Sequence, residues 1–137
     1  MKMRMLAAAG LCSATLFLGP GMARADKNFA VKVDAPDAQR GKPAKAELRV
    51  TTSAGWHVNN EFPASVTVIA PSGVDAPPGK IKPSRIEKGQ AAFDVGYTPR
   101  EAGAKTFNAV VSFAVCNDSN TQCEPRREPV KFTVNVK

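Results

Sequence analysis

Proline and glycine recur along most of this chain, at intervals too short for ordinary α-helices. They stand at seventeen positions between Pro36 and Pro129, and between them lie short segments rich in β-branched and aromatic residues. Within several segments apolar and polar residues alternate, as in strands with one buried face. Since no segment shows convincing helical periodicity, the pattern predicts an all-β domain.

The alternating segments define about seven strands. They are residues 28–33, 45–53, 56–58, 64–70, 90–97, 104–116 and 130–136, with a short extension at Val74. This number of short strands in about 110 residues predicts an immunoglobulin-like antiparallel β-sandwich. We expect one such domain over residues 26–137.

The first 25 residues have the order of a secretory signal peptide. Lys2 and Arg4 precede an apolar run from Leu6 to Leu18, and Ala23-Arg24-Ala25 forms a small-x-small cleavage site. The run is shorter than the roughly 20 apolar residues that span a bilayer, which disfavours an uncleaved anchor. Cys12 follows the bulky Leu11, which disfavours a lipoprotein signal. The prediction is a periplasmic or secreted protein.

Removing this segment changes the composition of the chain. The net charge falls from +7 to +4, because Lys2, Arg4 and Arg24 leave without any acidic residue. The remaining charges are interspersed, which is typical of ordinary solubility rather than of nucleic-acid binding. All four methionines also leave, so no thioether remains for a copper(I) site.

Two cysteines remain, Cys116 and Cys123, separated by six mostly turn-forming residues. A strong strand precedes Cys116 and another follows Pro129, so we expect a hairpin with one cysteine on each arm near its tip. Facing Cα atoms in such a pair lie about 4.5–5.5 Å apart, within the range of about 4.4–6.8 Å that a disulfide requires. In an oxidising compartment the pair predicts a disulfide.

The bridge has two alternative roles. As a structural staple it closes a short loop and stabilises the fold by roughly 2.5 kcal/mol on the chain-entropy estimate. As an exchanging pair it needs access and a stabilised thiolate, and a hairpin tip offers access. Arg126 and Arg127 would lower the pKa of the Cys123 thiol, whereas Asp118 and Glu124 would oppose this change.

Three segments carry a family resemblance. They are Gly55-Trp56-His57-Val58-Asn59, the segment from Phe62-Pro63 to Pro71-Ser72-Gly73-Val74, and Val111 to Cys116 with Cys123-Glu124-Pro125. Together they make residues 45–137 resemble the N-terminal periplasmic domain of the thiol:disulfide interchange protein DsbD.

The resemblance implies an immunoglobulin-like fold in which Cys116 and Cys123 exchange disulfides. Reducing equivalents would pass to other exported thiol proteins, with a membrane thiol carrier or a thioredoxin-like protein as partners, and no cofactor is implied. The competing hypothesis is a non-enzymatic binding or structural module of the cell envelope, with the disulfide as a staple.

Other candidate residues give weaker indications. His57, the single histidine, is interpreted as a structural or edge residue, although with Cys116 and Cys123 it could form a three-ligand zinc or copper site if the thiols stayed reduced. Trp56 is expected in the core. Residues 59–61 are polar enough to hold a ligand, but loop polarity explains them equally well. No pattern supports a hydrolase or a kinase.

Overall fold

The computed structural model describes residues 28–137. The predicted signal peptide, residues 1–25, lies outside the described residues. Within them, no helix has the length and apolar character needed to cross a membrane.

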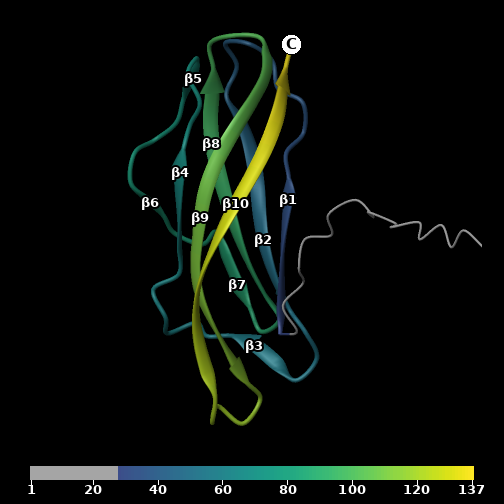
Figure 1. Cartoon of the computed structure of the whole chain (residues 1–137), viewed down its shortest axis with the longest axis vertical. Helices are drawn as coiled ribbons and strands as arrows, with labels where there is room; N and C mark the ends of the chain where they lie inside the picture. Colours follow the sequence, from purple (N-terminus) through teal and green to yellow (C-terminus); the bar gives the residue numbers. More distant parts are fainter. Residues whose placement is uncertain (1–27) are drawn as a thin grey trace, which may run out of the picture.

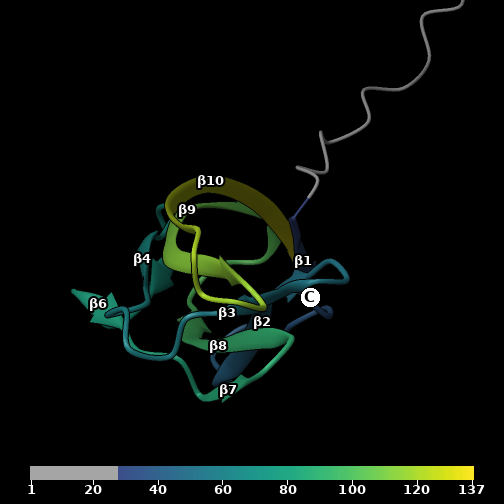
Figure 2. The ribbon, with the colours of Figure 1, turned by 90° about the horizontal axis from the view of Figure 1, so that it is seen from below.

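Two antiparallel sheets face each other and form a sandwich (Figures 1 and 2). The first sheet has the order β1-β2-β8-β5, with β7 also paired to β8, and the second has the order β10-β9-β4-β6, with β3 also paired to β9. The strands are β1 (Phe29–Asp34), β2 (Ala44–Thr52), β3 (Trp56–Val58), β4 (Ser65–Ile69), β5 (Val74–Asp75), β6 (Lys80–Ile81), β7 (Arg85–Glu87), β8 (Gln90–Pro99), β9 (Gly103–Asn117) and β10 (Cys123–Val136). The immunoglobulin-like sandwich expected from the sequence is confirmed.

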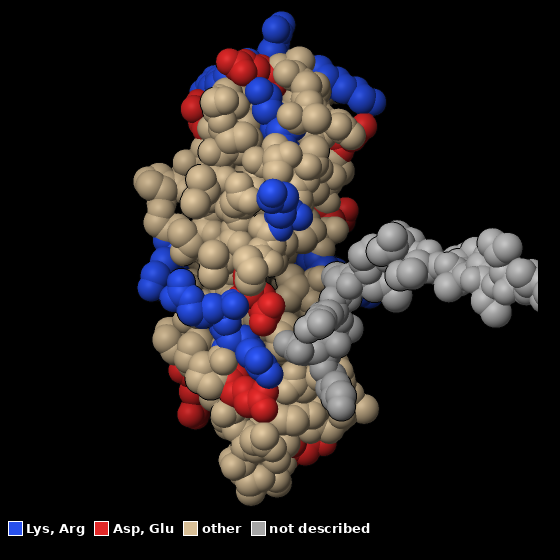
Figure 3. Space-filling model, viewed as in Figure 1, with Lys and Arg blue, Asp and Glu red and all other residues tan. Residues whose placement is uncertain are grey.

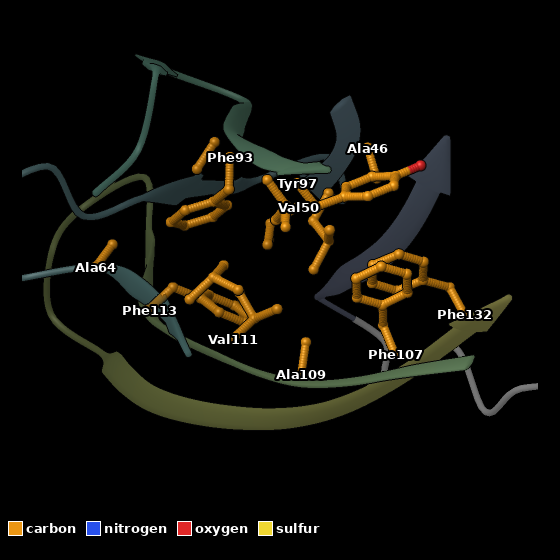
Figure 4. Close-up of a cluster of buried hydrophobic side chains, with 14 of the residues drawn as sticks. Ala46, Val50, Ala64, Phe93, Tyr97, Phe107, Ala109, Val111, Phe113 and Phe132 are labelled. Atoms are coloured by element: carbon orange, nitrogen blue, oxygen red, sulfur yellow. The ribbon is translucent and has the colours of Figure 1, made fainter. Parts of the chain in front are cut away.

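The core lies between the sheets and is built from alternate residues of the long strands. Phe107 of β9 contacts Tyr97 of β8 and stacks on Phe132 of β10, with ring centroids 5.0 and 4.9 Å apart. Phe113 meets Phe29 edge-on at 5.0 Å. Figure 4 shows Tyr97 from one layer and Phe107, Phe113 and Phe132 from the other pointing into the space between the sheets. Such aromatic pairs each add about 0.5–1.5 kcal/mol to the effect of burial.

The seven expected strands correspond to β1, β2, β3, β4, β8, β9 and β10, and the extension at Val74 is β5. The start expected for the last strand is wrong, because β10 begins at Cys123 and not at residue 130. Pro125 and Pro129 lie within it, opposite Ala114 and Val110. A proline has no N–H to donate, which is why the segment before residue 130 does not look like a strand.

The position of β10 at the edge of its sheet explains how it tolerates the prolines. Asn117 N–H donates to the Gln122 carbonyl, so the next pair, Cys116 with Cys123, is a non-hydrogen-bonded pair of the ladder. Pro125 and Pro129 share the register of Cys123, and at such positions of an edge strand the backbone nitrogen points away from the partner strand. No ladder hydrogen bond is therefore lost.

The first prediction concerns Tyr97. Its side chain is buried, and its hydroxyl has no hydrogen-bond partner among residues 28–137. We expect Tyr97→Phe to leave the free energy of unfolding unchanged or to raise it by about 1 kcal/mol, because a buried unsatisfied hydroxyl is removed and the ring contact is kept. Urea unfolding would measure this, with Tyr97→Ala as the control that should lose about 3–5 kcal/mol.

Burial also raises the pKa of the Tyr97 phenol above its ordinary value of 10.0. As the pH rises through 10, the phenol ionises first in the unfolded chain, so this residue makes the protein less stable at alkaline pH. Tyr97→Phe should lack this contribution. A loss of more than about 1 kcal/mol at neutral pH in Tyr97→Phe would contradict the assignment of an unpartnered hydroxyl.

Candidate disulfide site at the hairpin tip

Cys116 and Cys123 form a disulfide across the end of the β9–β10 hairpin, as the sequence predicted. The two residues face each other in the ladder, and their Cα atoms are 4.1 Å apart. The hairpin projects beyond the other long strands at one end of the sandwich (Figure 1). The bridge therefore lies at a projecting tip and not between the two sheets.

The two cysteines differ in accessibility. Cys116 is 2% exposed, whereas Cys123 is an exposed residue. The difference follows from topology, because β9 lies between β10 and β3 at this level and β10 is an edge strand. A reagent approaching from solvent meets Cys123 first.

The loop between the cysteines is held by the side chain of Asn117. Its Oδ1 accepts hydrogen bonds from the backbone N–H groups of Thr121 (2.9 Å) and Gln122 (3.2 Å), and its Nδ2 donates to Thr121 Oγ1 (2.9 Å). Asn120 has a φ of 55°, a left-handed conformation that asparagine tolerates. The turn thus holds the two arms together independently of the disulfide.

His57 lies directly opposite Cys116 on the side away from Cys123. This places His57, Cys116 and Cys123 in one row across β3, β9 and β10, with their side chains on the outer face of the sheet. Gly55 sets the register, since its carbonyl accepts the Asp118 N–H at 3.0 Å and its φ of 83° favours glycine. The sequence indicated a structural or edge role for His57 and grouped it with the two cysteines only as an alternative metal site, whereas the structure places it beside the disulfide.

The imidazole is largely buried, with 19% of the side chain exposed. Its Nδ1 has no hydrogen-bond partner among the described residues and lies 3.9 Å from Asp118 Oδ1. His57 also lines a hollow of about 350 Å³, together with Val58, Asn60, Ile86, Glu87 and Lys88. The charged side chains around it are thus Asp118, Glu87 and Lys88, and the Cys116–Cys123 disulfide lies on its other side.

Two of the charged residues that were expected to act on the Cys123 thiol lie on the opposite face of β10. Glu124 and Arg126 alternate with Cys123 along β10 and face the other side of the strand. There Arg126 Nη2 donates to Glu124 Oε2 at 2.7 Å, and its guanidinium lies 5.6 Å from the centre of the Phe29 ring. The expected influence of Arg126 and Glu124 on the Cys123 thiol is therefore corrected, while Arg127 shares the face of Cys123.

The structure also shows the surroundings of the other residues that the sequence indicates as candidate core, ligand-binding or metal-binding residues. Trp56 packs against the core, as expected. Asn59 Oδ1 accepts the Glu61 N–H at 3.0 Å, which fixes a local turn. In residues 28–137 no three or more His, Cys, Asp or Glu side chains form a group that could hold a metal ion. With both sulfurs in a disulfide, the trio of His57, Cys116 and Cys123 has no thiolate to offer a metal.

Comparison with known proteins adds structural neighbours but no family. No protein-family model matches the chain, and no curated protein matches it. The neighbours include the CARDB domain of a Pyrococcus furiosus protein in complex with di-metal ions (23% identity, TM-score 0.48, covering 80% of this chain and 88% of that one). They also include the fimbrial subunit AggA of Escherichia coli (14%, 0.45, 85% and 99%).

The N-terminal domain of Neisseria meningitidis DsbD, in its reduced form, is a weak match. It is 10% identical, with a TM-score of 0.37, and the match covers 66% of this chain and 75% of that chain. The neighbours are immunoglobulin-like β domains, and none of them assigns a function. The specific resemblance to the DsbD domain stays a prediction.

The second prediction concerns Glu124. Hydrogen bonds from Asn28 Nδ2 (2.9 Å) and Arg126 lower the pKa of its carboxyl below the ordinary value of 4.5. A lowered pKa stabilises the fold above pH 4.5, and this contribution is lost as the pH falls through the folded-state pKa.

We therefore expect Glu124→Gln to lower the melting temperature at pH 7, with a difference from wild type that shrinks as the pH falls below 4.5. Glu61→Gln, at an exposed loop glutamate, is the matched control and should follow wild type throughout. A constant difference between Glu124→Gln and wild type across this range would contradict the prediction.

Proposed function

We propose that this chain is an exported thiol–disulfide exchange protein that acts through Cys116 and Cys123. The observation that carries the proposal is the asymmetry of the bridge, in which an exposed Cys123 and a buried Cys116 share one disulfide at a projecting tip. Exchange requires one sulfur that a partner can reach and a second that resolves the mixed disulfide. A staple requires neither.

The exchange proceeds in two displacements. In the reduced protein the Cys123 thiolate attacks one sulfur of a partner's disulfide, forming a mixed disulfide and releasing the partner's other sulfur as a thiolate. Cys116 then attacks the Cys123 sulfur, closing the Cys116–Cys123 bridge and releasing the partner's second thiolate. Two electrons pass to the partner. A dithiol protein, such as a thioredoxin-like protein or a membrane thiol carrier, would reduce the bridge again.

His57 is positioned to move the proton of Cys116 in this cycle. Cys116 is buried, so its thiol must lose a proton to resolve the mixed disulfide, and its thiolate must be stabilised when the bridge is reduced. The His57 side chain lies opposite Cys116, with Asp118 beside Nδ1. A neutral imidazole accepts the proton, and Asp118 stabilises the imidazolium that forms.

Export is part of the same proposal. Disulfides persist in oxidising compartments such as the periplasm and the extracellular space. The predicted signal peptide over residues 1–25 and the disulfide agree with that location. We place the domain of residues 26–137 in the periplasm or outside the cell.

The third prediction tests the division of labour between the cysteines. Cys116→Ser should accumulate mixed disulfides with exported thiol proteins through Cys123, because nothing resolves them, whereas Cys123→Ser should accumulate few, because its remaining thiol is buried. Non-reducing gels of the two variants expressed in the periplasm would show the contrast. Equal and negligible trapping by both would refute exchange.

The reduction potential of the wild-type domain gives an independent measurement. We expect a value near about −200 mV, where exchange with cellular thiol carriers is readily reversible. A value below about −300 mV would identify a structural staple and support the alternative of a non-enzymatic envelope module.

The fourth prediction concerns His57. We expect His57→Asn to slow resolution of a mixed disulfide on Cys123 by about tenfold or more and to remove a titration step from the pH profile of that rate. Asn60→Ala, which alters the same hollow without touching the row of three residues, is the control. An unchanged pH profile in His57→Asn would exclude a role in proton transfer, whatever the change in stability.

A further inference from the structure

The outer face of the β4–β9–β10 sheet carries the disulfide at one end and an apolar groove further along. The term outer face is used here for the alternate ladder positions whose side chains point away from the core. Ile69 is a large apolar residue on this face, and 69% of its surface is exposed. Figure 3 shows a largely uncharged surface over the middle of the molecule, seen from this side.

The groove has a volume of about 280 Å³, and its lining is mostly apolar. Its walls come from three strands: Thr67 and Ile69 of β4, Asn108 and Val110 of β9, and Pro129 and Lys131 of β10. The volume suits a single apolar side chain, since pockets for drug-sized ligands range from about 300 to 1,000 Å³.

The charged residues at the outer-face positions of β4, β6, β9 and β10 are all basic, although Asp118 lies beside His57 at the tip. These basic residues are Arg127 and Lys131 of β10 and Lys80, which pairs with Thr67 at the β6 edge. No Asp or Glu occupies an outer-face position of β4, β6, β9 or β10, because Glu124 and Glu128 belong to the other face of β10. An acidic segment would complement this face, and a basic one would be repelled.

The distance between the groove and the disulfide follows from the positions of their residues along β9 and β10. Val110 and Cys116 are six residues apart on β9, which in a strand is about 20 Å. They lie on the same face, as do Pro129 and Cys123 on β10. An extended peptide on this face would place side chains six residues apart over the groove and over Cys123, with Arg127 between them.

Resting on the proposed exchange function, we propose that this face docks the partner's cysteine-bearing segment. The segment is extended and acidic, and it carries a large apolar residue six positions from the reactive cysteine. The apolar residue fills the groove, the acidic residues lie beside Arg127 and Lys131, and the cysteine reaches Cys123. This face thus selects partners, while the disulfide performs the chemistry.

The test uses synthetic peptide disulfides and the Cys116→Ser variant, in which Cys123 is the reacting thiol. One nine-residue peptide carries a cysteine blocked as a mixed disulfide, a leucine six positions away and three glutamates between them. A second peptide replaces the glutamates with lysines, and a third replaces the leucine with serine. The neutral small disulfide 2,2′-dithiodipyridine is too small to bind along the outer face, so it reports the reactivity of the Cys123 thiol alone.

At low salt we expect the acidic leucine peptide to react at least tenfold faster than the lysine peptide, with the advantage falling at high salt. Adding Arg127→Glu and Lys131→Glu to Cys116→Ser should reverse this preference. Adding Ile69→Ser should slow the leucine peptide by about five- to tenfold and leave the serine peptide unchanged. Ile69→Ser should not alter the reaction with the small disulfide. Because Arg127 shares the face of Cys123, each peptide rate is divided by the rate of the same variant with the small disulfide, and an added Lys42→Glu, on a loop, serves as the charge control.

The outcomes separate the two proposals. If Cys123 fails to react even with the small disulfide, the proposed function fails. If the small disulfide reacts but the three peptides react at equal rates, exchange stands and docking on this face is refuted. Docking is also refuted if sedimentation shows a wild-type dimer that Ile69→Ser converts to a monomer, since a second copy would then occupy the groove.

Discussion

The antiparallel pairing of β9 with β10 is the interaction on which the rest of the structure depends. Fourteen consecutive residue pairs, from Gly103 with Val136 to Cys116 with Cys123, keep one register without a bulge. Because side chains alternate across a strand, one constant register assigns every residue of both strands to a face. The inner face supplies Phe107, Phe113 and Phe132 to the core, and the outer face carries the disulfide and the groove. A slip of one residue would exchange the two sets.

The sequence predicted most of this architecture because alternation is a local property. The buried series from Phe107 to Val115 is visible in the residue order, and so is the turn between the cysteines. The start of β10 was missed because prolines at 125 and 129 look like strand breakers, and they are harmless only at the edge of a sheet. Edge position depends on strand order, which is a property of the whole fold.

In the disulfide site, too, features within one hairpin could be predicted from the sequence, whereas contacts between distant strands could not. The disulfide was predictable, since its cysteines lie in one hairpin. His57 is almost sixty residues from Cys116 in sequence, and only the pairing of β3 with β9 brings them together. The side to which Arg126 turns follows from the register of β10, whose first seven residues were not expected to be a strand. Local patterns therefore identified the disulfide pair but not its surroundings.

Pro125 and Pro129 have a consequence beyond strand assignment. A fourteen-residue strand at the edge of a sheet is a template on which another chain could add a strand. Here two outward backbone positions lack a donor, and the end of the strand is capped by the bridge between Ala38 and Val136. The protein can thus present a long, accessible hairpin beside its exposed cysteine without offering a surface for β-aggregation.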